Sequence, residues 1–565
     1  MKNTILAILL VLTALLTVGC EDFLTRPPMD QMTDETYWTS EENVKSFAWD
    51  FYPHFFSGYG SGYAWGRYYR GQSLNDNLIA TAPVDFVENV PTSGGGFSFG
   101  YVRKANLMLD RVKGVPMGEE AVEHWKGVSR FFRALEYNNL VQRFGDIQWY
   151  DKVLTKDDEA LYKKRDDRIK VMDNVLADFQ YAIENVRLDA GTAGLTVNKD
   201  VVLAFMSRVF LYHGTYLKYH DLNQEKAKEY LRAAQSAAKQ LIESGRYELA
   251  SDYRGLFTSL SLDGNPEIIM YRKYEEGVLT HSLNSYSNDE SQVYGLTKDA
   301  VDSYLVNDGL PIEQSPNYEG DTTIQQVMTN RDPRISETMA DKLRLSGMDG
   351  LERGYSVTGY AQHKFLNEDI ADQTIGSSNL NPTDAPVIRY GEVLLNYAEA
   401  TYELGELTNS DLDKSINVLR SRTGIDMPAL QVSGEQAMVN GQVITDPDRD
   451  PNVSGILWEI RRERRVELMM EGFRLDDLKR WKKLEYVDTI DNPDINRGAW
   501  ISLDDYPEAN VYIEGGNNEG YIVPASEQQA QRRFDDERVY LSPLPLDQIT
   551  LFKNHGVDLE QNPGW

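Results

Sequence analysis

The sequence predicts a mostly α-helical protein with long irregular connections and a few short strands. Apolar residues repeat at helical spacing over many segments of the 565-residue chain. Strict alternation of apolar and polar residues is confined to short pieces such as Glu267 to Tyr271. Residues 245–385 and 485–565 lose this periodicity and are rich in Gly, Pro, Asn, Asp and Tyr. Such long ordered loops usually carry function or cap a scaffold.

The composition excludes some classes of function. Lys and Arg number 58 against 88 Asp and Glu, a net charge of −30, which argues against nucleic-acid binding. The 33 Tyr, 19 Phe and 9 Trp residues are typical of an ordered chain. A single Cys can close no intrachain disulfide and, with seven scattered His, can build no Cys-based zinc site. The sequence therefore predicts no metal and no cofactor.

The N-terminus resembles an export signal that ends at the only cysteine. Lys2 precedes an apolar stretch from Ile5 to Val18, and Gly19 stands directly before Cys20. This stretch is short for a membrane span. Cys20 could simply follow a signal peptide, but its position favours a lipidation site, although Thr17 departs from the Leu that is usual there. The mature protein would then be held by acyl chains.

The helices are predicted in order along the chain. After a tether with two prolines, Thr39 or Ser40 with Glu41 and Glu42 indicates the start of a first core helix that runs past Pro53. Further helices are expected at 100–113, 120–143, 168–187, 199–217, 225–244, 386–404, 411–422 and 455–482. Consecutive helices have lengths and loops typical of stacked helical hairpins, although no strict 34-residue repeat fits.

Several motifs resemble the SusD/RagB family of surface lipoproteins of Bacteroidota. They are the CEDFL that begins at Cys20, NRDPR from Asn330, APVIRYGEVLLNYAEA from Ala385, ERRVELMMEGFRLDDLKRW from Glu463 and the terminal QNPGW from Gln561. The motifs follow the family's order and extend over essentially the whole mature chain.

The resemblance implies a fold, a location and a function. It implies four degenerate tetratricopeptide-like helix pairs with long loops, and an outer-membrane lipoprotein at the cell surface that acts as the lid of a SusC-like TonB-dependent transporter. The chain then divides into a signal peptide (1–19), a lipid-anchored tether (20–40), an N-terminal helical part (41–250), a loop-rich ligand-side part (251–385), a C-terminal helical part (386–484) and a loop-rich C-terminal part (485–565).

Catalytic patterns are weak in this sequence. Gly96 to Gly100 matches the G-x-S-x-G elbow around Ser98, but no strand precedes it, so a loop-to-helix transition is the better interpretation. Glu463, Glu467 and Glu471 alternate with arginines on a predicted helix, where carboxylates are ordinarily ion-paired, and Arg464 could pair with Glu467. The sequence therefore predicts a protein that is not an enzyme.

Two loop stretches combine rings with polar side chains, as stacking on a sugar requires. Ser57 to Asn77 is the denser one, and its Asn75-Asp76-Asn77 lies where the family often has an acidic landmark before a binding loop. Tyr271 to Tyr294 is the second, within which His281 is predicted to lie at the surface. The candidate ligand-binding residues are Tyr63, Trp65, Tyr68, Asn75, Asp76, Asn77, Phe86, Tyr286 and Tyr294.

Each of these residues also has a structural interpretation. A Tyr or Trp in a Gly-rich loop can bury its ring as an anchor and hydrogen-bond its polar tip. Asp76 can equally cap a turn. The function predicted is non-catalytic binding of a glycan, an oligosaccharide or polysaccharide, for delivery to the transporter. The alternatives are a peptide-capturing relative of the RagB branch and a surface glycan-degrading enzyme.

Overall fold

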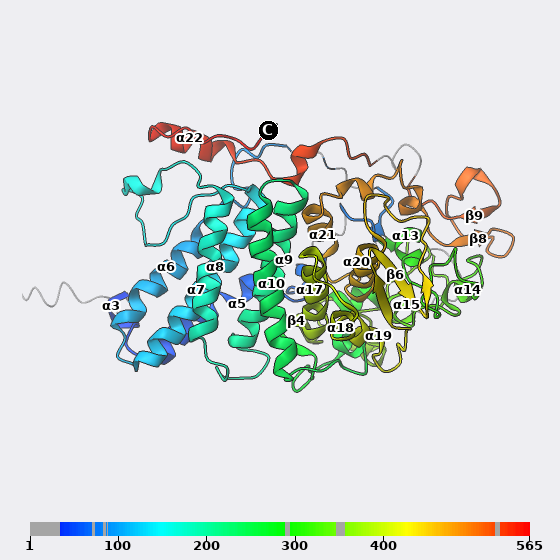
Figure 1. The fold of residues 1–565 in the computed structure, drawn as a ribbon, viewed down its shortest axis with the longest axis horizontal. Coiled ribbons are helices and arrows are strands. Elements are labelled where there is room, and N and C mark those ends of the chain that lie inside the picture. Colours follow the sequence, from blue (N-terminus) through cyan, green and yellow to red (C-terminus); the bar gives the residue numbers. More distant parts are fainter. Residues whose placement is uncertain are drawn as a thin grey trace, which may run out of the picture.

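The computed structural model describes residues 34–69, 74–82, 86, 89–288, 294–345, 356–525 and 532–565. The fold is mostly helical with a few short strands, as the sequence predicts (Figure 1). The predicted signal peptide, Cys20 and most of the tether lie outside the described residues. In Figure 1 the long helices fill the left and centre of the molecule, and the loop-rich part lies at the right.

The longer helices are α6 (Gly100–Arg111), α7 (Glu119–Phe144), α8 (Arg168–Asn185), α9 (Lys199–Tyr219), α10 (Gln224–Ser244), α17 (Tyr390–Glu403) and α20 (Gly455–Glu467). Most of them agree closely with the predicted segments, whereas α17 and α20 cover only part of theirs. Side chains at their starts explain several boundaries. Asn198 accepts a hydrogen bond from the N–H of Val201 at α9, and Asn223 accepts one from Lys226 at α10. Gly245 ends α10 in the left-handed conformation.

Shorter helices and strands form the connections. The helices are α3 (Asp34–Tyr37), α4 (Glu41–Trp49), α5 (Tyr52–Phe55), α11 (Gly255–Thr258), α12 (Leu283–Asn288), α13 (Lys298–Asp302), α14 (Ile324–Met328), α15 (Arg334–Thr338), α16 (Glu368–Ala371), α18 (Asn409–Asp413), α19 (Ile416–Arg420), α21 (Arg474–Arg480) and α22 (Leu546–Asn554). The strands are β1 (Leu78–Ile79), β2 (Ile268–Arg272), β3 (Gly295–Leu296), β4 (Ala385–Arg389), β5 (Leu430–Ser433), β6 (Gln436–Val439), β7 (Gln442–Val443), β8 (Trp500–Ser502) and β9 (Glu519–Tyr521). Ser40 caps α4, as predicted.

The helices stack in chain order, and the C-terminal helices extend the stack. α6 packs on α7, α7 on α8, and α9 on α10; α17 then packs against α9 and α10, and α20 packs on α17 (Figure 1). The largest apolar core lies among these helices, and a second one lies beneath the loop-rich part. The last segment returns to the N-terminal helices, where the N–H of Ser542 donates to Arg143 O (2.7 Å). The predicted boundaries of the parts stay a prediction.

Three predicted helices are shortened or divided. The helix expected at 386–404 begins only at Tyr390, because residues 385–389 form β4 and pair antiparallel with β2. The first core helix is divided into α4 and α5, and the 411–422 segment into α18 and α19. In each case a nearby turn or strand pairing overrides the apolar periodicity.

The segment expected as one helix at 455–482 is also divided. α20 ends at Glu467 and α21 begins at Arg474, and between them Met470 and Gly472 have φ angles of +63° and +79°. A Cβ added to Gly472 would lie 2.2 Å from the backbone oxygen of Arg67. The break therefore lets a turn approach the loop that carries the candidate ligand residues, an approach that only glycine permits.

Candidate functional site

A tight glycine turn fixes the first candidate loop. The N–H of Ser61 donates to Ala64 O (2.9 Å) and the N–H of Ala64 to Ser61 O (3.0 Å). Gly60 has a φ of +93°, and a Cβ at this position would lie 1.9 Å from Ala64 O. The N–H of Gly62 donates to Thr280 O (2.9 Å), which joins the turn to the second candidate stretch. The structure therefore brings the two predicted stretches together.

Tyr63 and Trp65 project from this turn and are accessible. Tyr63 is 69% exposed, and its hydroxyl is hydrogen-bonded to the hydroxyl of Ser378. Trp65 is 38% exposed, and its Nε1 donates to Ser282 Oγ (3.1 Å). The Trp65 ring meets the edge of Tyr286 with 4.7 Å between centroids. Both rings are thus held in place while part of each surface stays open.

We call Tyr63, Trp65 and Asn379 the aromatic platform. The Asn379 amide lies beside the turn, because a Cβ on Gly62 would be 3.7 Å from its Nδ2. The neighbouring Leu380 is 41% exposed. Open rings beside an amide provide both a stacking surface and hydrogen-bonding groups. Sequence reasoning missed Ser282, Ser378 and Asn379, because a polar loop without periodicity gives no signal of what it contacts.

Asn75, Asp76 and Asn77 are buried and form part of the scaffold. Asn75 Oδ1 accepts hydrogen bonds from the N–H groups of Asn77 (2.9 Å) and Leu78. Asp76 is ion-paired with Arg474, whose Nε donates to Oδ1 (2.7 Å), and Asn77 Oδ1 accepts from Arg465 Nε (2.7 Å). Burial raises the pKa of Asp76, but the two arginines outweigh it and hold that pKa below its ordinary value. These side chains do not reach solvent, so their predicted contact with a ligand finds no support in their placement.

The other candidate rings lie inside the protein or at its edge. Tyr68 is buried and its hydroxyl donates to Pro386 O (2.8 Å). Phe86 is buried beside Leu478 and Tyr540, and Tyr294 is partly buried against the second core. Tyr286 packs edge-to-face against the ring of Trp65 and is itself 6% exposed. Contact of these residues with a ligand stays a prediction.

His281 is not at the surface, so that prediction is wrong. It is fully buried, and its Nε2 lies 3.0 Å from the oxygens of Thr383. The backbone N–H of His281 donates to Asn381 O (3.1 Å). His281 also forms an isolated β-bridge with Gly62. Burial lowers the pKa of His281 to about 4, so the ring is neutral at pH 7. It joins the platform turn to the 374–381 loop.

The carboxylates of the Glu463–Trp481 motif are ion-paired, as predicted, although with different partners. Glu467 binds Arg334, Arg389 and Arg422, whereas the expected pair of Glu467 with Arg464 does not form. Arg464 instead binds Asp477 (2.9 Å). Glu463 and Glu471 are paired with Arg420 and Lys364. These groups are buried and neutralised in pairs, which is the arrangement of a scaffold rather than of an acid poised for catalysis.

Ser98 lies in a loop that leads into α6. Its hydroxyl oxygen accepts a hydrogen bond from the N–H of Gly100 (3.3 Å), the first residue of that helix. Residues 89–97, which precede it, contain no strand. The nucleophile elbow requires a strand there, so the loop-to-helix interpretation is confirmed.

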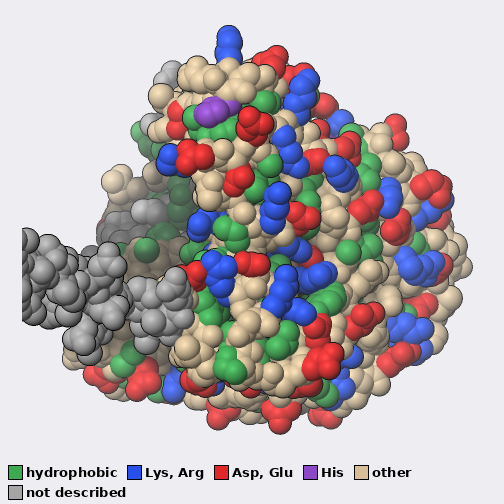
Figure 2. Space-filling view, turned by 90° about the vertical axis from the view of Figure 1, so that its left-hand side faces the viewer, with side chains coloured by type: hydrophobic (Ala, Val, Ile, Leu, Met, Phe, Trp, Pro, Cys, Tyr) green, Lys and Arg blue, Asp and Glu red, His purple; other side chains and the backbone are tan. Residues whose placement is uncertain are grey.

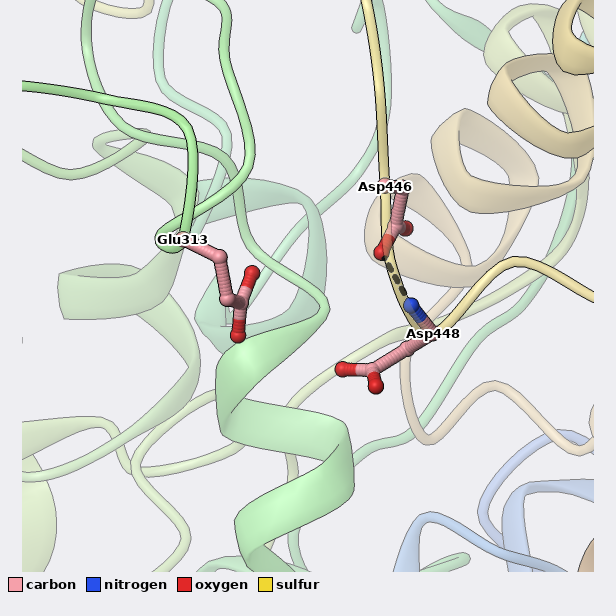
Figure 3. Close-up of side chains that lie close together, drawn as sticks. All are labelled: Glu313, Asp446 and Asp448. Atoms are coloured by element: carbon pink, nitrogen blue, oxygen red, sulfur yellow. Dashed lines mark hydrogen bonds between the residues drawn. The ribbon is translucent and has the colours of Figure 1, made fainter.

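One cluster of carboxylates was not predicted. Oxygens of Glu313, Asp446 and Asp448 lie within 4.8 Å of one another, as Figure 3 shows. Burial, together with the charges of Glu313 and Asp446, raises the pKa of Asp448. Asp446, however, is ion-paired with Arg462 and accepts a hydrogen bond from Trp458 Nε1 (2.7 Å). A cation would have to compete with Arg462, and we assign no metal to the cluster.

The surface and the helices give two further observations. On the face in Figure 2, basic and acidic side chains are interspersed with apolar ones, and neither charge forms a large continuous area. Among the described residues, every helix falls short of the length and hydrophobicity that a bilayer span requires.

The structure combines a stacked helical scaffold with accessible rings on loops and a buried network of ion pairs. The comparison with known families agrees: residues 264–565 match the SusD family, and the chain belongs to it. The prediction of the family from its motifs is confirmed.

Individual relatives resemble the chain along most of its length. SusD-like protein P38 of Formosa agariphila is 25% identical over 523 residues, which cover 88% of this chain and 95% of the relative. A SusD-like carbohydrate-binding protein of Bacteroides fragilis superposes with a TM-score of 0.66 at 21% identity, covering 92% and 99% of the two chains. A laminarin-binding SusD-like protein superposes with a TM-score of 0.54 at 17% identity, covering 94% and 100%.

Proposed function

We propose that this protein binds a glycan at the cell surface without changing it chemically and delivers it to a SusC-like TonB-dependent transporter in the outer membrane, for which it acts as a lid. The observation that carries the proposal is the aromatic platform, where Tyr63 and Trp65 stay accessible while hydrogen bonds from two other loops hold them. Pre-positioned rings reduce the entropy lost when a flexible sugar chain is bound. Membership of the SusD family supports the ligand class.

The sites that could suggest catalysis have structural roles. Ser98 is engaged with the start of α6, and Glu463, Glu467 and Glu471 are paired with basic side chains. A glycosidase needs two carboxyl groups that face each other across a substrate, one of them able to donate a proton. The aromatic platform itself contains no carboxylate. These observations favour binding over hydrolysis.

Anchoring and partnership are part of the same proposal. A lipid on Cys20, joined to the body through the tether, would hold the protein at the outer membrane beside a transporter. A lid requires a broad contact, and the stacked helices and long loops provide extended surfaces for one.

The first experiment measures binding and chemistry together. The lipid-free mature chain is screened against a glycan array and a peptide library, and the best ligand is then recovered after long incubation and chromatographed. We expect a glycan to bind and to return unchanged. Shortened products from pure protein would support the enzyme, and binding of peptides alone would support the RagB-like alternative.

The second experiment tests the transporter partnership. The full lipoprotein is extracted in mild detergent from its native membrane, captured through a C-terminal tag and analysed by mass spectrometry. We expect a TonB-dependent barrel in stoichiometric amount. Recovery of the lipoprotein alone, under conditions that preserve other outer-membrane complexes, would contradict the lid.

A further inference from the structure

A cavity of about 650 Å³ lies between the helical stack and the platform loop. Ligand pockets for small molecules typically occupy about 300–1,000 Å³. Its walls come from segments that are distant in sequence: the end of α5, residues 65–68, α7, α9, β4 and the α20–α21 region. Trp65 forms part of the wall, so the cavity adjoins the aromatic platform without including Tyr63.

The walls of this central cavity are mixed: apolar side chains such as Phe205 and Leu211 share the lining with charged side chains, and most of the charged groups are already paired. Arg208 binds Glu392 through two contacts of 2.6 Å, and Arg389 binds Glu471 (2.7 Å). Arg480 lies 2.8 Å from Asp477, which also accepts from Arg464. A packing defect in an apolar core would have apolar walls and would be dry. This cavity differs from such a defect, because ordered hydrogen-bonding groups share its lining with the apolar side chains.

Some lining groups keep their hydrogen-bonding capacity. The Asp476 carboxylate accepts no hydrogen bond from the described residues, and the nearest basic group among them is Arg67, with 3.8 Å between its Nη2 and Asp476 Oδ2. The side-chain amide of Gln142 has no hydrogen-bond partner in the described part of the chain, and Asn139 keeps its amide N–H groups available while its oxygen accepts a long bond from Asn138 (3.4 Å). A carboxylate and two amides can together accept from and donate to hydroxyl groups.

The balance of charges in the cavity lining indicates which class of ligand fits. The described lining includes five arginines and four carboxylates, and further carboxylates that pair with these arginines, such as Glu399 and Glu467, lie behind the lining, so neither charge is in large excess. A neutral ligand therefore suits the cavity better than an acidic or a cationic one. Phe473 also lines the cavity, but the guanidinium groups of Arg67 and Arg208 already lie over its ring, 4.6 and 5.2 Å from the centroid.

We propose that the central cavity is a second ligand site, which binds a small neutral sugar independently of Tyr63. The proposal extends the glycan-binding function proposed above and rests on it for the ligand class. Asp476 and Gln142 hydrogen-bond the sugar hydroxyls, and Asn139 stands at an exposed part of the wall. The aromatic platform and the central cavity are then two sites with different size limits, one for extended chains and one for short sugars.

The test uses defined probes. The lipid-free mature chain is titrated by calorimetry with glucose, galactose, mannose, xylose, maltose, cellobiose and laminaribiose. Asn139→Phe narrows the cavity from α7, and Asp476→Asn removes its open carboxylate with little change of shape. Gln180→Phe, at an exposed position on α8, and Asp263→Asn, at an exposed loop position, are the matched controls. Thermal unfolding of every variant checks the fold.

We expect at least one probe to bind the wild type, and both cavity variants to weaken it at least about tenfold, while the controls and Tyr63→Ala stay within about twofold. Equal affinity in the wild type and the folded cavity variants would overturn the proposal, as would a loss in Tyr63→Ala equal to theirs. If polysaccharides bind the wild type but no probe does, the second site is wrong and the proposed function stands. If neither binds, both are wrong.

Discussion

Arg389, at the end of β4, and Glu467, at the end of α20, form a fully buried ion pair with 2.7 Å between Nη1 and Oε1. A second guanidinium nitrogen of Arg389 donates to the backbone oxygen of Glu467 (2.9 Å). The pair joins the strand that begins the APVIRY motif to the helix of the ERRVEL motif. The two strongest family motifs therefore meet in one hydrogen-bonded cluster, and their chemistry is that of a scaffold.

Glu467→Gln should destabilise the fold severely. The substitution removes the negative charge shared by Arg334, Arg389 and Arg422, so a buried cluster in which each arginine keeps one other carboxylate partner or more is left with too little negative charge. Breaking a buried pair in this way costs roughly 3–5 kcal/mol. Urea unfolding followed by circular dichroism measures the change, with Glu519→Gln at an exposed position as the control. Equal unfolding midpoints for the two variants would contradict this account.

Stability should fall as the pH drops below about 4. Burial raises the pKa of Asp166 and Asp450, but hydrogen bonds from Lys163 and Lys483 outweigh it, and both values fall from 3.8 to about 2. The unfolded chain then binds protons at a higher pH than the folded chain does. Their contribution is therefore fully present above about pH 4 and is lost as the pH falls toward 2.

The ionisation of Asp302 changes the stability in the opposite direction and over a different pH range. Burial raises its pKa to about 6 in spite of Lys298, so its contribution decreases as the pH rises from about 4 to 6. Urea unfolding between pH 2 and 7 measures both effects. Asp450→Asn should reduce the loss below pH 4. A free energy of unfolding that stays constant from pH 4 to 2 would show that these pairs do not have the assumed pKa values.

Gly472→Ala should disturb the turn that supports the platform loop. The new methyl group would meet the backbone oxygen of Arg67 at 2.2 Å, and the φ of +79° adds strain. Gly424 has a similar φ of +83° with open space around it, so Gly424→Ala carries the strain alone. Strain of this kind costs about 1–3 kcal/mol. We expect the thermal midpoint of the Gly472 variant to lie clearly below that of the Gly424 variant.

Cys20→Ala should release the protein from the membrane. Cys20 is the only thiol in the chain and follows the predicted export segment, so lipid can be attached to no other cysteine. Fractionation of cells, with metabolic labelling by a fatty-acid analogue, measures anchoring. A variant that stays in the membrane fraction, together with a wild type that takes up no label, would refute the lipoprotein interpretation.

The sequence was informative where local pattern decides the structure and uninformative where distant contacts decide it. The helix expected at 120–143 is observed at Glu119–Phe144, because its apolar face and its ends are local properties. Residues 385–389 form a strand because β2 lies beside them, and the break after Glu467 places Gly472 against Arg67, about four hundred residues away in sequence. Dependence on distant contacts also explains why the sequence could not separate ligand-binding residues from scaffold residues at the candidate site. Asp76 and Trp65 look alike as polar or aromatic loop residues, and only the fold shows that one is buried beside arginines and the other is accessible.

Truncation at the aromatic platform should weaken glycan binding. Trp65→Ala should lower the affinity for the glycan at least about tenfold. Because it also removes the edge contact with Tyr286 and the hydrogen bond to Ser282, it should lower the melting temperature as well.

Tyr63→Ala separates these effects. Tyr63 is 69% exposed, and its hydrogen-bond partner in the described chain is the hydroxyl of Ser378. We expect at least about a tenfold loss of affinity for the glycan found by array screening, with a nearly unchanged melting temperature. Tyr63→Phe keeps the ring and tests the hydroxyl. Tyr512→Ala, at a tyrosine that is 72% exposed in the β8–β9 loop, is the matched control. If Tyr63→Ala and Tyr512→Ala bind the glycan equally well, stacking at the platform does not hold the ligand.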